Sequence, residues 1–165
     1  MIITLLLSLI FIASIILMLY SAVALVQKKA FFSSAPKDIQ EKIIERKESR
    51  FKGARAIGRV LFLISLLAAV GAFIYGAYDG IRNNYTFWEF FARFLIMLYL
   101  YKAFDIVCFD WFLLTKTHFY QHYYPETEGC EGYKNFGFNK KSQIAKLIIF
   151  PFISALVALL CMLIK

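Results

Sequence analysis

Long apolar runs alternate with short polar stretches along this chain. Residues 2–26 contain no charged side chain, and a helix over this run rises about 37 Å, which exceeds the roughly 30 Å of hydrocarbon in a bilayer. Two further apolar runs lie at 59–78 and 144–164, and their only charged residues, Arg59 and Lys146, lie at or near the start of each run. The pattern predicts a transmembrane helix at each of the three runs.

A fourth run, over 90–115, is rich in aromatic side chains but carries Lys102, Asp105 and Asp110. Three charges deep in a membrane helix cost about 8–10 kcal/mol, whereas the Leu, Ile, Val and Phe residues between Phe94 and Leu114 return only about 4–7 kcal/mol on the same scale. We therefore predict a third transmembrane helix in chain order that inserts poorly alone and needs its neighbours.

Small residues and one proline mark how these helices should pack. Ala68, Ala72, Gly76 and Gly80 fall four apart, so they form one ridge on which a neighbouring helix can approach closely. Pro151 lies inside the last run, where it should bend the helix; membrane helices tolerate this when a neighbour satisfies the freed carbonyl.

The fold class that follows is an all-α integral membrane protein, a single membrane domain of four transmembrane helices joined by polar segments at 27–58 and 116–143. Ser34 and Pro36 precede a stretch in which opposite charges recur four apart, which favours a short amphipathic helix in the first segment. The charge pairs are Lys37 with Glu41, Asp38 with Lys42 and Glu48 with Lys52. We expect its isoleucines, Ile39, Ile43 and Ile44, to face headgroups or the bundle.

Composition and charge agree with a membrane location and add an orientation. Apolar residues make up 61% of the chain and charged residues 18%, far from the values of soluble domains. Ten of the nineteen Lys and Arg residues lie at 28–59. The positive-inside rule makes this connection cytosolic and both termini non-cytoplasmic. The net charge of +8 then indicates contact with anionic lipid headgroups at the basic first loop rather than with nucleic acid.

The charges of the 90–115 run form the first candidate site. Lys102 and Asp105 lie one helical turn apart, whereas regular α-helical geometry points Asp110 about 140° away from Asp105. An intramembrane polar site of Lys102, Asp105 and Asp110 that binds a proton, an ion or a lipid headgroup is one interpretation. An internal Lys–Asp pair that only specifies packing is the other.

Two histidines beyond this run form the second candidate site. His118 and His122 are four apart, and Glu126 and Glu128 follow, so metal binding or proton transfer is a hypothesis. The HExxH arrangement of zinc proteases is absent, and nothing fixes a third and fourth ligand. We therefore favour an interfacial aromatic belt with two hydrated histidines, and assign no cofactor.

Two functional hypotheses remain open at this stage. The first is a non-enzymatic membrane protein, either a small transporter or channel-like bundle or an accessory subunit, which assembles with itself or with a membrane partner because four helices leave little room for a pathway. The second is an enzyme that acts on a lipid or another membrane-borne substrate at the cytosolic interface. The glycine- and aromatic-rich segment 125–142 is expected either to fold back over the helices or to dip into headgroups.

Overall fold

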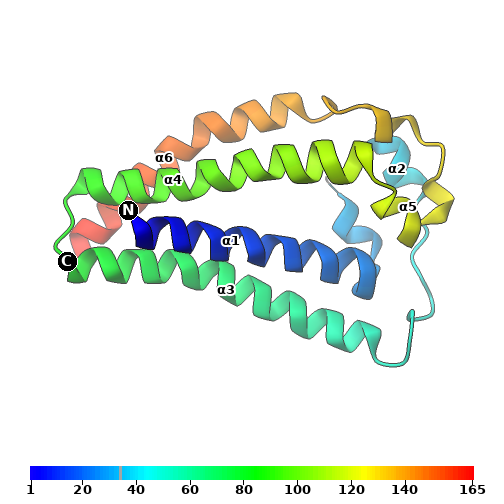
Figure 1. Ribbon diagram of the computed structural model, residues 1–165, viewed down its shortest axis with the longest axis horizontal. Coiled ribbons are helices and arrows are strands. Elements are labelled where there is room, and N and C mark those ends of the chain that lie inside the picture. The colour runs from blue at the N-terminus through cyan, green and yellow to red at the C-terminus, as the bar shows by residue number, and fades with distance from the viewer. Residues whose placement is uncertain (34) are drawn as a thin grey trace. The chain divides into compact units, whose positions relative to one another are not determined.

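The computed structural model describes residues 1–33 and 35–165, and every regular element in these ranges is helical (Figure 1). The predicted cap Ser34 lies outside the described residues. The long helices are α1 (Ile2–Tyr20) with its π-helical extension η1 (Ser21–Val26), α3 (Ala54–Arg82), α4 (Phe87–Phe104) with its π-helical extension η3 (Asp105–Lys116), and α6 (Lys140–Ile164). The short elements are η2 (Lys29–Phe32), α2 (Lys37–Lys42), α5 (Phe119–Tyr123), η4 (Pro125–Thr127) and η5 (Glu131–Lys134).

Three helices are long and apolar enough to cross a membrane: Ile2–Val26, Ala54–Arg82 and Lys140–Ile164. This confirms the all-helical class and indicates a membrane location. The second of these begins at Ala54, directly after Gly53, whose φ of +89° ends the preceding turn. The helix thus extends on both sides of the predicted membrane run at 59–78.

The chain divides into two compact units, which we call unit 1 and unit 2. Unit 1 comprises Met1–Ile15, Leu66–Phe104 and Lys141–Lys165; unit 2 comprises Ile16–Ser65 and Asp105–Lys140. In unit 1, parts of α1, α3, α4 and α6 pack around one core. Its buried members are Leu7, Ala72, Phe90, Phe94, Met97, Ala158 and Cys161.

The small-residue ridge of α3 is a packing face, as predicted. A Cβ atom added to Gly76 would meet Leu7 at 3.4 Å and Phe94 at 3.6 Å, and one added to Gly80 would overlap the ring of Phe90. Since Phe90 is fully buried, its ring has no room to withdraw. The glycines therefore allow α1 and α4 to approach the α3 backbone.

In α6, the carbonyl that Pro151 leaves without a helical donor is hydrogen-bonded by a neighbouring helix, as predicted. Pro151 has no N–H, so the carbonyl of Leu147, four residues earlier, loses its helical donor. The hydroxyl of Tyr99 in α4 donates to this carbonyl at 3.2 Å. A side chain of a neighbouring helix thus satisfies the group that proline leaves unpaired.

Unit 2 has a core of its own, to which α2 contributes. Ile39 and Ile43 are buried there, whereas Ile44 is exposed. The helix is shorter than the charge pattern predicted, because the backbone turns extended at Ile43 and the N–H of Ile44 donates to the carboxylate of Glu126 at 3.1 Å. The predicted pair of Glu48 and Lys52 consequently lies outside any helix.

The segment after α5 folds back onto unit 2. The N–H of Gly132 donates to Asp38 Oδ2 at 2.8 Å, and a side chain at this glycine would collide with Pro36. Further along, the hydroxyls of Tyr133 and Thr127 share a buried hydrogen bond of 2.6 Å. Part of the segment 125–142 thus packs against the α2 region of unit 2.

Candidate functional site

The π-helix η3 changes the direction in which its aspartates point. Hydrogen bonds here join residues five apart, as at the end of η3, where the N–H of Thr117 donates to the carbonyl of Phe112 at 3.1 Å. Residues five apart then lie on nearly the same side of the helix. The prediction that Asp110 points about 140° away from Asp105 is therefore wrong, since it assumed α-helical geometry.

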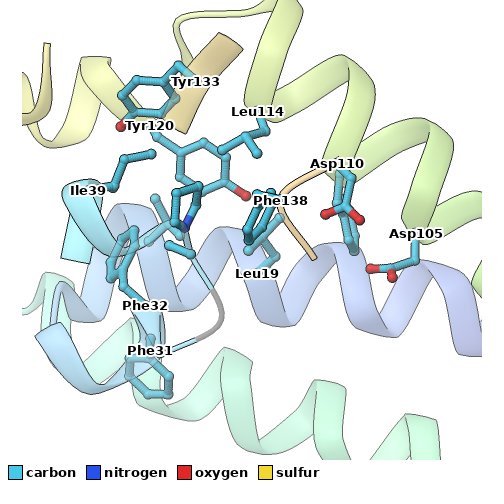
Figure 2. A pocket seen from close by; sticks show the side chains of 14 residues that line it. Leu19, Phe31, Phe32, Ile39, Asp105, Asp110, Leu114, Tyr120, Tyr133 and Phe138 are labelled. Carbon is cyan, nitrogen blue, oxygen red and sulfur yellow. The ribbon is translucent and has the colours of Figure 1, made fainter. Parts of the chain in front are cut away.

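Asp105 and Asp110 both line a cavity of about 130 Å³ within unit 2 (Figure 2). Aromatic rings from four segments, at Phe32, Phe109, Tyr133 and Phe138 among others, enclose most of it. The complete lining consists of Leu19, Val23, Phe31, Phe32, Ala35, Pro36, Ile39, Asp105, Phe109, Asp110, Leu114, Tyr120, Tyr133 and Phe138. The cavity is therefore apolar and aromatic except for its carboxylates and two phenols.

The lining carries negative charge only. Its fourteen residues, all described, include two aspartates and no Lys, Arg or His. Burial raises the pKa of Tyr120, and the nearby Asp110 carboxylate raises it further. Burial also raises the pKa of Tyr133 to about 12, against the opposite effect of its hydrogen bond with Thr127. Both phenols thus stay protonated at neutral pH.

One polar contact fixes the outer carboxylate. The side-chain amide of Asn139 donates to Asp110 Oδ2 at 3.0 Å, so the start of α6 holds Asp110 in place. Lys102, the third member of the predicted polar site, lies in α4 and is almost completely buried. Its pairing with Asp105 stays a prediction.

The histidine region is organised by two arginines. Arg46 pairs with Glu126 at 2.7 Å, and Arg50 lies 3.3 Å from His122 Nε2. His118 and His122 are both exposed, and Glu128 is exposed as well. Within residues 1–33 and 35–165, no group of three or more His, Cys, Asp or Glu side chains is arranged to hold a metal ion.

A buried ion pair in unit 1 was missed from the sequence. Arg93 Nη2 lies 2.7 Å from Asp79 Oδ2, Nη1 donates to the carbonyl of Gly76 at 2.6 Å, and Nη2 also donates to the hydroxyl of Tyr85 at 2.7 Å. Neither Asp79 nor Arg93 was among the candidate site residues predicted from the sequence. The available signal was a pair of opposite charges flanking the short connection at 83–86, which makes α3 and α4 antiparallel neighbours.

No family model, curated protein or solved structure matches this chain. The chemistry of the cavity in unit 2 is nevertheless specific. Carboxylates attract a cation, and the faces of Phe and Tyr rings add a cation–π attraction within about 6 Å. The cavity volume is close to the roughly 150 Å³ that holds a benzene-sized molecule, so the arrangement suits a small organic cation.

Proposed function

We propose that this chain is a non-enzymatic membrane protein that binds a small organic cation in the cavity of unit 2, as a small transporter or as an accessory subunit of one. The observation that supports the proposal is the pair of aspartates, Asp105 and Asp110, turned into one aromatic cavity by a π-helix. Carboxylates that line an aromatic cavity attract a cation, and π-helices recur at functional sites. A substituted ammonium ion of about six heavy atoms satisfies the volume and the charge together.

The proposed arrangement in the membrane has four spans. The three apolar helices are three of these spans. The fourth is α4 with η3, which continue as one helix from Phe87 to Lys116. This helix crosses the bilayer only with neighbouring helices that shelter its charges. Residues 27–58 and 116–143 then lie in the cytosol and both termini outside. Because one chain of this size offers little room for a complete pathway, we infer assembly with a second copy or a partner subunit.

Binding can be tested on the purified protein in a neutral detergent. We expect tetramethylammonium and choline to bind with affinities that calorimetry can measure, and uncharged tert-butanol to bind at least about tenfold more weakly, a difference of about 1.4 kcal/mol. Asp110→Asn should weaken tetramethylammonium binding about tenfold or more. Glu128→Gln removes an exposed carboxylate elsewhere in unit 2 and should leave binding unchanged. Equal losses in the two variants would contradict the proposal.

Reconstitution separates the two forms of the proposal. Uptake of labelled tetramethylammonium by vesicles that contain this chain alone would support a transporter. Binding without uptake would support an accessory subunit.

The orientation is tested with introduced cysteines. The native Cys130 is a poor target because it is buried, with Sγ 3.7 Å from the carbonyl of Asp38. Lys134→Cys and Arg82→Cys place a thiol at exposed positions expected on the cytosolic and the outer side, respectively. In intact cells, an impermeant thiol reagent should label only the second, and the reverse result would invert the topology.

The enzymatic alternative receives no support from the geometry of its candidate residues. Glu126 is engaged by Arg46 and His122 by Arg50, and among the described residues these side chains form no group of three or more that could hold a metal ion. Metal analysis of protein purified without chelator is the decisive measurement. Near-stoichiometric metal that disappears in the His118→Gln, His122→Gln variant would favour the enzymatic function.

A further inference from the structure

A second pocket of unit 2 carries the opposite charge. It is an open groove of about 280 Å³ lined by Gln27, Arg46, Glu48, Arg50, His122 and Tyr123. Its lining brings the basic segment after α2 together with α5 and with the residue that ends η1. None of these residues lines the acidic cavity, so the groove is a separate feature.

The two arginines of the groove have different surroundings. Arg46 is held by Glu126 at 2.7 Å and by the carbonyl of Tyr123 at 3.2 Å. Arg50 instead lies over the ring of Tyr123, 5.0 Å from its centroid, and beside His122. Among the described residues it has no carboxylate partner. Arg50 is therefore a positioned guanidinium whose charge is available to a ligand.

His122 and Gln27 add neutral hydrogen-bonding groups. Arginine cannot accept a hydrogen bond, so in its 3.3 Å contact with Arg50 the Nε2 atom of His122 is the acceptor. An anion that enters between them takes over the arginine donors, and an imidazole N–H is a further donor of the groove. Gln27, whose side chain ends in an amide, lines the same groove. Gln27 is itself fixed, with φ of +55° and its N–H donated to the carbonyl of Ala22.

The surrounding charge also favours an anion. Residues 42–59 contain seven Lys and Arg against two Glu, a net charge of +5 that the ion pair of Arg46 with Glu126 reduces to +4. The carboxylate of Glu48 lines the groove and opposes an anion, but its side chain is exposed and can turn into solvent. Arg55 binds the main-chain carbonyls of Arg46 and Glu48 and thereby holds this segment in place.

We propose that Arg50, His122 and Gln27 form a binding site for a phosphomonoester. A guanidinium binds two oxygens of a phosphate side by side, and the imidazole and the amide can reach a third. The groove begins at Gln27, directly after the candidate span Ile2–Val26, which is the depth of lipid phosphates when that span crosses a bilayer. The phosphate can belong to a lipid such as phosphatidic acid or to a free ion.

The test uses native mass spectrometry of the purified chain with short-chain lipids. Dioctanoyl phosphatidic acid should bind at least about fivefold more tightly than dioctanoyl phosphatidylserine, because its headgroup carries the higher charge and a terminal phosphate. Arg50→Gln should weaken phosphatidic acid binding about tenfold. Arg50→Lys keeps the charge but not the paired N–H donors of the guanidinium, so it should weaken phosphatidic acid binding less than Arg50→Gln does.

A matched control is Lys52→Gln, which removes one positive charge from the same exposed segment outside the groove and should change binding less than about twofold. Equal losses in Arg50→Gln and Lys52→Gln, or equal binding of the two lipids, would overturn the site in favour of diffuse attraction. Inorganic phosphate that binds as tightly as phosphatidic acid identifies a free ion, and binding at least about tenfold weaker identifies a lipid. Asp110→Asn should leave this site intact, so the two proposals fail separately.

Discussion

The two units bury ionisable side chains in different ways. In unit 1, the guanidinium of Arg93 is surrounded by a carboxylate, a carbonyl, a hydroxyl and the face of Tyr85, 4.4 Å from the ring centroid. In unit 2, Asp105 and Asp110 face a cavity whose lining holds no basic residue. A charge held by several partners stabilises one packing arrangement. A carboxylate that lines a cavity is placed to contact a cation that enters.

Disruption of the ion pair in unit 1 should have the largest effect on stability. Arg93→Met leaves the Asp79 carboxylate buried without its cation and should lower the free energy of unfolding by about 3–5 kcal/mol. Denaturant titration in detergent measures this. The double variant Asp79→Asn, Arg93→Met leaves no charge behind and should regain most of the loss. If the double variant is as unstable as the single one, the guanidinium acts by packing and not by pairing.

Lys102 and Asp105 offer the next largest effect. In the proposed four-span arrangement each charge left alone costs about 2.5–3.5 kcal/mol, so Lys102→Met and Asp105→Asn should each lower the yield of folded protein more than the double variant does. Folded yield by size-exclusion chromatography reports the difference. Additive losses would show that the two residues do not pair, and would make Lys102 unlike Arg93.

Tyr133 tests the segment that covers the cavity. Tyr133→Phe removes a buried hydrogen bond with Thr127 and should cost about 1 kcal/mol at neutral pH. The folded pKa of Tyr133 is about 12, above the ordinary value of 10, so the unfolded chain loses this proton first. Stability of the parent protein should therefore fall from pH 10 to 12, and more steeply than in Tyr133→Phe. If the free energy of unfolding falls equally between pH 10 and 12 in the parent protein and in Tyr133→Phe, the phenol of Tyr133 is in contact with water and not buried.

Asp110→Asn should have the smallest effect on stability and thus sharpen the contrast with Arg93. The variant removes a charge from an apolar cavity while an amide keeps most of the shape, so we expect a change within about 1 kcal/mol of the parent, of either sign. Unfolding in denaturant without added ligand measures it. A loss as large as that of Arg93→Met would mean that Asp110 serves the fold and not a ligand.

Much of the fold was predictable because it follows from local rules. Apolar runs of sufficient length predict membrane helices, and all three such runs are helices of the required length. The ridge of Gly76 and Gly80 and the need for a donor near Pro151 follow from the absence of a side chain and of an N–H, respectively. Each of these rules applies to one segment by itself and does not depend on which segments pack together.

The candidate site was only partly predictable, for a physical reason. Asp105 and Asp110 were recognised by their cost in a membrane helix, but their common direction depends on a π-helix, and an apolar pattern does not distinguish hydrogen bonds over four residues from those over five. The ion pair of Arg93 with Asp79 depends on the register of an antiparallel helix pair. The early end of α2 depends on Glu126, more than eighty residues away, which binds the N–H of Ile44.

The contact between Tyr99 and Leu147 has a consequence for the order of assembly. A ribosome delivers α4 before α6, so the hydroxyl that satisfies the Leu147 carbonyl is already in the protein when Pro151 arrives. Docking of α6 on the earlier helix then supplies the donor that proline removes. A fragment that begins after Tyr99 lacks this donor. Biogenesis of the last helix therefore has a built-in direction, from the amino terminus to the carboxyl terminus.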